Sequence, residues 1–164
     1  MATAFLMAMR SPDNETRHGA VIVDDETHRI LGTGFNGFPR GCKDDKLPNT
    51  RPGKYPFVIH AEVNALINCK GIDRPENCTI YVTGEPCNEC FKLIVQHQLK
   101  RIVYAGVGSN MINSNQQHNL IKQAISEGLP IKIEPLSSDI QPLVKLLQQT
   151  AQYMDKCGTT EGHL

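Results

Sequence analysis

The sequence has no excess of charge of either sign. Its 17 Lys and Arg residues balance 17 Asp and Glu residues, so the formal net charge is zero. A protein that binds nucleic acid without reading its sequence normally carries a basic excess, so this balance argues against a long nucleic-acid track. A small anionic ligand is still compatible with it, because one phosphate needs only a local basic pocket.

Long apolar segments are absent as well. No run approaches the roughly 20 apolar residues that a membrane helix requires. The apolar opening, residues 1–10, lacks the leading basic region of a secretory signal and indicates a short amphipathic helix. We therefore expect a cytoplasmic protein without a membrane partner. In that compartment thiols are reduced, so a close cysteine pair indicates metal or redox chemistry before a disulfide.

The chain shows no internal repeat, and no linker interrupts its first 150 residues. Its length predicts one domain, placed at 1–155, with a flexible tail over 156–164. Short β-branched runs alternate with helical stretches, and this order predicts a mixed sheet with helices on both faces. Strands are expected over 20–23 and 29–35 (a hairpin), 79–83, 102–106 and 131–135, helices over 60–71, 87–98, 116–127 and 140–155, and a loop over 35–54.

Two motifs lie where the central helices are expected to begin: His60-x-Glu62, and Pro86-Cys87-x-x-Cys90. Right-handed crossovers place both helix starts at one sheet edge, where ligands of open α/β sheets collect. Cys87 and Cys90 share a helix face, and Pro86 suits the first helical position, where its missing N–H costs nothing. The helix dipole favours both cysteines as thiolates.

His60 would complete three protein ligands and leave a tetrahedral zinc with one open position, the arrangement of a catalytic site. Cys69 lies nine residues beyond His60, about 13 Å along a continuous helix, and would not reach the same ion. Spacing alone leaves Cys42, Cys78, Cys157 and the other histidines open as fourth ligands. The open site is the favoured interpretation.

Glu62 raises a geometric difficulty, because residues two apart do not normally share a helix face. The difficulty shrinks if the metal lies off the helix N-terminus. Alone, a Glu in a first turn is ordinary dipole compensation. H-x-E followed by P-C-x-x-C is, however, the signature of zinc-dependent nucleobase deaminases. Under that interpretation zinc supplies an activated water and Glu62 moves the protons.

Longer strings are more specific than the metal motif. RSPDNETRHGAVIV, GTGFNGFPRGC, DDKLP, KYPFVIHAEVNAL and YVTGEPCNECFKLI resemble the deoxycytidylate (dCMP) deaminase family, over residues 1–106 and more weakly to about 135. The resemblance implies a three-layer α/β/α cytidine-deaminase-like fold with a central mixed sheet of about five strands. It also implies a Zn²⁺ cofactor and hydrolysis of dCMP to dUMP and ammonia.

The resemblance further implies substrate contacts. Asn36 corresponds to a loop asparagine that contacts sugar and base, although a turn residue beside Gly37 is the alternative interpretation. The backbone at Gly84 and Glu85 would accept the departing amine. Val58 or Ile59 would wall the base, with core packing an equally good reading of each.

Many members of the family are hexamers that dCTP activates and dTTP inhibits, so a homo-oligomer and these effectors are expected partners. The FNGFPRG loop is the expected effector site. The candidate phosphate or effector contacts, which could equally be solvated loop charges, are Gly37, Arg40, Lys43, Arg51 and Lys54.

The chain departs from the family after the 102–106 strand. Better-known eukaryotic members carry Ser-Asp and Tyr-His there, whereas residues 106–110 of this chain read GVGSN. A base-modified dCMP or a cytidine nucleoside therefore stays open as the substrate. Three other interpretations remain. A tRNA adenosine deaminase would need a basic surface, and a structural-zinc interaction domain would need a fourth protein ligand. A redox C-x-x-C protein would leave His60 and Glu62 without a role.

Overall fold

The computed structural model describes residues 1–106, 122–137, 142, 145–146 and 149, with the side chain of residue 44 left aside. Its helices are α1 (Ala2–Ala8), α2 (Ala61–Asn68) and α3 (Asn88–Gln96), with short 3-10 turns η1 (Asp44–Lys46) and η2 (Pro75–Asn77). Its strands are β1 (Gly19–Asp24), β2 (Ile30–Phe35), β3 (Cys78–Val82), β4 (Arg101–Tyr104) and β5 (Lys132–Pro135). Residues 122–126 are also helical.

The five strands form one mixed sheet in the order β2-β1-β3-β4-β5. β1 is antiparallel to both β2 and β3, whereas β3, β4 and β5 run parallel. The start of β1 and the ends of β2 and β3 therefore meet at one sheet edge. This edge brings together His18, which precedes β1, Asn36, which follows β2, and Gly84, which follows β3.

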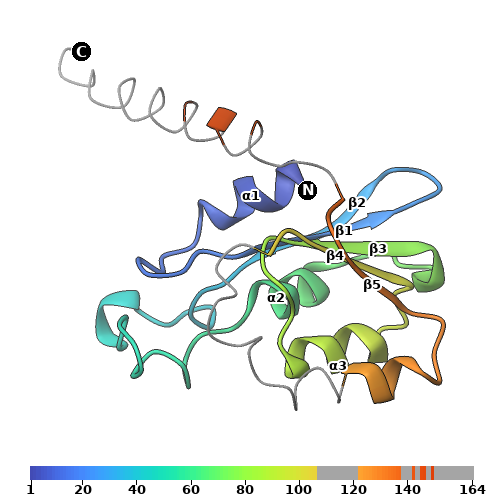
Figure 1. Cartoon of the computed structure of the whole chain (residues 1–164). Coiled ribbons are helices and arrows are strands. Elements are labelled where there is room, and N and C mark those ends of the chain that lie inside the picture. The colour runs from blue at the N-terminus through green and yellow to red at the C-terminus, as the bar shows by residue number, and fades with distance from the viewer. Residues whose placement is uncertain (107–121, 138–141, 143–144, 147–148, 150–164) are drawn as a thin grey trace.

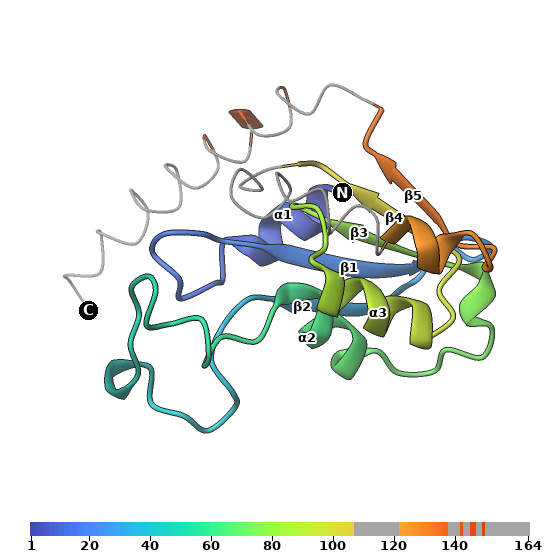
Figure 2. The same ribbon diagram turned by 60° about the horizontal axis from the view of Figure 1, so that its bottom comes forward.

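Helices cover both faces of the sheet, as the sequence predicts. Figure 1 shows α1 above the sheet and α2 and α3 below it, and Figure 2 shows the same layers from another side. The helical residues 122–126 lie on the α3 side. The core contains apolar residues of β1, β3 and β4 together with Ala61, Ala65, Phe91 and Ile94 of α2 and α3. None of the helices that the structure describes is both long and apolar enough to cross a membrane.

Glycine lets α2 lie directly on β2. A Cβ on Gly34 would lie 2.2 Å from the carbonyl oxygen of Ala61, and one on Gly32 would lie 2.5 Å from that of Ala65. No side chain fits in these gaps, so the helix backbone packs on the strand backbone. The first turn of α2, which carries Glu62, is thereby fixed against the sheet edge.

Several expected boundaries need correction. The two central helices begin one residue later than predicted, because His60 and Cys87 have extended backbones and act as N-caps. Pro86 therefore precedes the N-cap and does not occupy the first helical position. Helix α2 ends at Asn68, before Gly71, whose positive φ of 70° belongs to the turn that follows.

The later predictions are only partly within the described chain. Of the helix expected over 116–127, residues 122–126 are described and helical. Of the closing helix over 140–155, residues 142, 145, 146 and 149 are described and helical. The tail over 156–164, Cys157 and the departure from the family after residue 106 lie outside the described residues.

Candidate active site

The two helix starts place three metal-ligating side chains together. His60 caps α2 and Cys87 caps α3, each with an extended backbone, and Cys90 lies in the first turn of α3. The side chains of an N-cap and of the third helical residue approach each other at a helix start. Cys87 and Cys90 use this relation to form one half of the group, and His60 of the neighbouring helix forms the other half.

The donor atoms fit a zinc ion. Nδ1 of His60 lies 3.5 Å from Sγ of Cys87 and 3.3 Å from Sγ of Cys90, and all three ligand atoms lie within 4.8 Å of one another. Tetrahedral coordination with Zn–S near 2.3 Å and Zn–N near 2.0 Å separates sulfur from nitrogen by roughly 3.5 Å. One imidazole and two thiolates are also a donor set that zinc prefers.

Within the described part of the chain, no fourth His, Cys, Asp or Glu joins this group. Cys42 is exposed, Cys69 caps the end of α2, and Cys78 is buried at the start of β3, where its Sγ donates to the Arg74 carbonyl. Cys87 and Cys90 are both free thiols and form no disulfide. The three-ligand arrangement is thus the one that the described residues offer.

The contact between the two thiols shifts their pKa values in opposite directions. The contact with the Cys90 thiol lowers the pKa of Cys87 to about 3, and the same contact raises the pKa of Cys90. The contact with Cys87 also raises the pKa of His60. A divalent cation at this point would favour both thiolates and neutral imidazole together.

Glu62 is buried beside the three donors, with 6% of its surface exposed. A first-turn Glu that only compensates the helix dipole would be exposed, so the burial rules out that interpretation. Its burial raises the pKa of the carboxyl group. The difficulty of two residues on different helix faces also disappears, because His60 is a non-helical cap and only Glu62 follows helix geometry.

His60, Glu62 and Cys87 lie in the wall of one pocket at the sheet edge. The residues that line it come from the loop before β1, the ends of β2 and β3, the segment before α2 and both helix starts. They are Asp13, Thr16, His18, Asn36, Arg51, Lys54, Tyr55, Val58, His60, Ala61, Glu62, Val82, Gly84, Glu85 and Cys87.

The structure separates the residues expected to contact the substrate. Asn36, Gly84 and Glu85 line the pocket. Asn36 is buried, and its φ is not positive, so it is not a left-handed turn residue. Of Val58 and Ile59, Val58 lies among the lining residues, whereas the backbone of Ile59 pairs with Gly37 in an isolated β-bridge.

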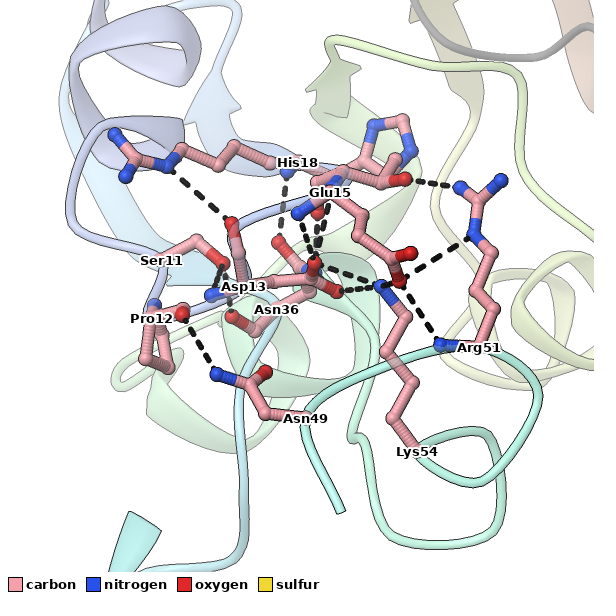
Figure 3. Close-up of polar contacts among 11 residues, drawn as sticks. Ser11, Pro12, Asp13, Glu15, His18, Asn36, Asn49, Arg51 and Lys54 are labelled. Atoms are coloured by element: carbon pink, nitrogen blue, oxygen red, sulfur yellow. Dashed lines mark hydrogen bonds and ion pairs between the residues drawn. The ribbon is translucent and has the colours of Figure 1, made fainter. Parts of the chain in front are cut away.

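Of the five candidate phosphate or effector residues, two line the pocket. Arg51 and Lys54 line the pocket, but both already contact acidic or hydroxyl side chains, as Figure 3 shows. Arg40 and Lys43 are exposed in the 36–54 loop, and Arg40 donates to the side chain of Asn68. These two and Gly37 are not among the described residues that line the pocket.

Sequence reasoning missed several polar residues in this pocket and next to it. His18 lines the pocket, its Nδ1 lies 3.3 Å from Oγ1 of Thr83, and burial lowers its pKa. Lys122 donates to Glu85 at 2.7 Å and is buried. No local motif marks these residues, because tertiary folding brings them to the pocket.

Comparison with known proteins agrees with this geometry. Residues 1–106 match the model of the cytidine and deoxycytidylate deaminase zinc-binding region. Human deoxycytidylate deaminase is 46% identical over 110 residues, which are 63% of this chain and 61% of that protein. The chain thus spans less than two thirds of that relative's length. The deoxycytidylate deaminase of Mycobacterium phage D29 is 36% identical over 119 residues, 63% of this chain and 89% of that protein.

A solved structure supports the fold independently. The dCMP deaminase of cyanophage S-TIM5, in complex with dCMP and dUMP, superposes with a TM-score of 0.61 at 27% identity. The match covers 82% of this chain and 91% of that one. The expected three-layer cytidine-deaminase-like fold with a five-stranded mixed sheet is therefore confirmed.

Proposed function

Because the chain belongs to the cytidine and deoxycytidylate deaminase family, we propose that it hydrolyses dCMP to dUMP and ammonia. The observation that carries the proposal is the group of His60, Cys87 and Cys90 with the buried carboxyl group of Glu62 beside it. The 46% identity to deoxycytidylate deaminases supports dCMP as the substrate.

His60, Cys87 and Cys90 would hold the zinc ion. The chemistry that zinc supplies when bound is a water whose pKa falls to about 7, a nucleophile near neutral pH. The three side chains would contribute two negative charges and an imidazole, and they would leave one coordination position for solvent.

Glu62 is proposed as the proton carrier. Its carboxylate takes a proton from the attacking water and delivers it to N3 of the cytosine ring, while oxygen bonds to C4. The same carboxylate then takes the proton of the hydroxyl group now on C4 and delivers it to the exocyclic amine, so that the C4–N bond breaks, the C4 carbonyl forms and ammonia leaves. The buried position suits this task. Burial raises the pKa of Glu62, and proton transfer is most efficient when the pKa of the catalytic group lies near the working pH.

Other pocket residues orient the substrate in this proposal. The backbone at Gly84 and Glu85 accepts hydrogen bonds from the departing amine, and Asn36 contacts sugar and base. Val58 forms an apolar wall for the ring. Arg51 is the proposed contact for the 5′-phosphate, since it is the one arginine among the described residues that line the pocket and it belongs to the exposed segment 50–53.

The role of Glu62 is tested by Glu62→Gln, which keeps the size of the side chain and removes the base. We expect zinc content to stay at one ion per chain and turnover of dCMP to fall by at least about 10²-fold, the usual contribution of a positioned base. Metal analysis and an ammonia-release assay measure both. Near-normal turnover by the variant would refute the assigned role.

A substrate panel tests the assignment to dCMP. Ammonia release is compared for dCMP, CMP, deoxycytidine, 5-substituted dCMP and tRNA, each with the zinc-loaded protein. We expect dCMP to give the highest kcat/KM. Activity confined to tRNA or to adenine compounds would overturn the pyrimidine assignment and leave the metal site standing.

Assembly, regulation and location are parts of the same proposal. Membership of the family favours a homo-oligomer, with a hexamer expected, and a response to dCTP and dTTP through the loop that contains Gly37, Arg40 and Lys43. A single catalytic domain over 1–155 and a cytoplasmic location complete it. Light scattering of the purified chain, with and without each nucleotide, tests the oligomer and the effectors.

A further inference from the structure

An ionic cluster lies at the wall of the pocket, with Asp13, Asn36 and Lys54 buried and Glu15 and Arg51 exposed. Figure 3 shows three chain segments meeting there: the loop before β1, the end of β2, and the segment that leads to α2. We call it the Asp13 cluster, and its members are Asp13, Glu15, Asn36, Arg51 and Lys54.

Lys54 has no donor left for a ligand. Its ammonium group is 2.7 and 2.8 Å from the two oxygens of Asp13 and 2.8 Å from Oε2 of Glu15. An ammonium group has three N–H donors, and these three contacts use them all. The side chain is only 3% exposed. A phosphate could bind Lys54 only by displacing a carboxylate, so the contacts favour a role inside the protein.

Asp13 connects Lys54 to Asn36, because its carboxylate contacts both side chains. Its Oδ2 accepts from Nδ2 of Asn36 at 3.3 Å, and its Oδ1 accepts from the backbone N–H groups of Glu15 and Thr16. Burial alone would raise the pKa of Asp13, but the hydrogen bonds from Lys54 and these backbone groups outweigh it and lower the pKa. Asp13 is therefore charged at neutral pH and holds the loop and the amide together.

The amide of Asn36 has a single permitted orientation. Nδ2 donates to Asp13 and, at 2.9 Å, to the Thr16 carbonyl, and Oδ1 accepts from the backbone N–H of His18 at 2.7 Å. Turning the amide over would set its NH₂ group against the His18 N–H and its oxygen against two acceptors. One lone pair of Oδ1 has no contact with a described residue, so the amide can still accept from a ligand.

Lys54 is also tied to the approach to α2. Its carbonyl accepts from the backbone N–H groups of Phe57 and Val58, and Ile59 then pairs with Gly37 directly after Asn36. The ammonium group and the backbone of one residue therefore restrain both Asn36 and the segment that ends at His60.

We propose that Lys54 is a positioning residue: through Asp13 it fixes the Asn36 amide in the orientation that receives the substrate, and it does not bind phosphate itself. The inference rests on the proposed function for the part played by Asn36. It explains why a lysine in the pocket wall is fully paired with carboxylates of the same chain.

The kinetic test is Lys54→Met, which keeps the aliphatic stem and removes the ammonium group. We expect KM for dCMP to rise about tenfold with kcat within about twofold, because a contact made equally in ground and transition states acts on KM. Tenfold is the size of one to two ordinary hydrogen bonds. Zinc content stays unchanged. Lys100→Met is the matched control, since Lys100 pairs with Asp25 at the opposite sheet edge and should leave KM unchanged.

A double-mutant cycle separates positioning from simple loss of stability. In the Asn36→Ala background, Lys54→Met should raise KM by less than about twofold, because the group through which Lys54 acts is already gone. Additive losses, or an unchanged KM in the folded single variant, would overturn the inference. Lys54→Gln, which replaces the ammonium group by a neutral amide donor, is used in place of Lys54→Met if the latter does not fold.

A second readout needs no activity. The backbone N–H of His18 donates to Asn36, whereas that of the next residue donates to Thr83. In Lys54→Met we expect hydrogen exchange at His18 to accelerate at least about tenfold relative to exchange at Gly19. Equal exchange in both proteins contradicts the inference. If the wild type does not deaminate dCMP, the proposed function fails, and the exchange measurement still decides whether Lys54 holds Asn36.

Discussion

At the scale of single residues, the backbone conformation of two caps decides the chemistry. The ψ angle is 155° at His60 and 168° at Cys87, so both residues are extended rather than helical, and their side chains contact each other between the two helix starts. A helical conformation at His60 would place its imidazole and the Glu62 carboxyl group on different faces. The extended cap removes that conflict and lets both groups face the same pocket.

The ion pair of Asp13 and Lys54 predicts a specific pH dependence of stability. The folded pKa of Asp13 lies below its ordinary value, so the pair contributes fully above the unfolded pKa of about 3.9 and is lost as pH falls through the folded value. We expect Lys54→Met to lower the free energy of unfolding by about 3–5 kcal/mol near pH 7, as for other broken buried pairs. Urea titrations at pH 7 and below pH 4 should show this difference shrinking in acid. A constant difference would contradict the assignment.

At the scale of elements, two glycines of β2 set the position of α2. The helix that carries Glu62 approaches the strand until backbone meets backbone, and His60 is fixed at its start. Because α3 supplies the two cysteines from the next crossover, the distance between His60 and the thiols depends on how closely α2 packs on the sheet.

Gly34→Ala tests this dependence. Its Cβ would lie 2.2 Å from the Ala61 carbonyl oxygen and 2.4 Å from the Ala65 nitrogen, which are backbone atoms that cannot rotate away. We expect the free energy of unfolding to fall by about 1–3 kcal/mol and zinc affinity to weaken, because α2 must shift. Gly128→Ala is the control, since nothing lies within 4 Å of that position. Denaturant titration and competitive zinc binding measure both effects. Equal stability of the two variants would show that α2 can accommodate a Cβ at residue 34 without loss of packing.

At the scale of the whole molecule, the metal-ligating group joins two helices that pack on the same face of the sheet. An ion that binds the folded chain at this point stabilises it, and at 100 times the dissociation constant the gain is about 2.7 kcal/mol. For a chain of this size that gain corresponds to a rise in Tm of roughly 5–11 °C.

We therefore expect zinc to raise Tm and a chelator to reverse the rise. Differential scanning calorimetry of the chelated and the zinc-saturated protein measures the shift. A Cys87→Ser, Cys90→Ser double variant is the matched control and should melt at one temperature under both conditions. A zinc-dependent shift that survives in this variant would place the ion elsewhere.

Much of the fold could be predicted from the sequence because its signals are local. The hairpin of β1 and β2, strands β3, β4 and β5, and the alternation of strands with helices follow from runs of β-branched residues and from turn residues. The helix starts were misjudged by one residue at His60 and at Cys87, because a cap and a first-turn residue have the same composition signals and differ only in ψ.

By itself the sequence determined the metal chemistry. One histidine, a glutamate two residues beyond it and two cysteines three residues apart form a pattern typical of a catalytic zinc site. The spacing within each motif is fixed by covalent connection along the chain. The tertiary structure alone decided what surrounds them. It buries Glu62. It also pairs Lys54 with Asp13 and Lys122 with Glu85, residues that lie 41 and 37 positions apart in the sequence. Such contacts depend on strand order and on helix packing against glycine, which no local pattern encodes.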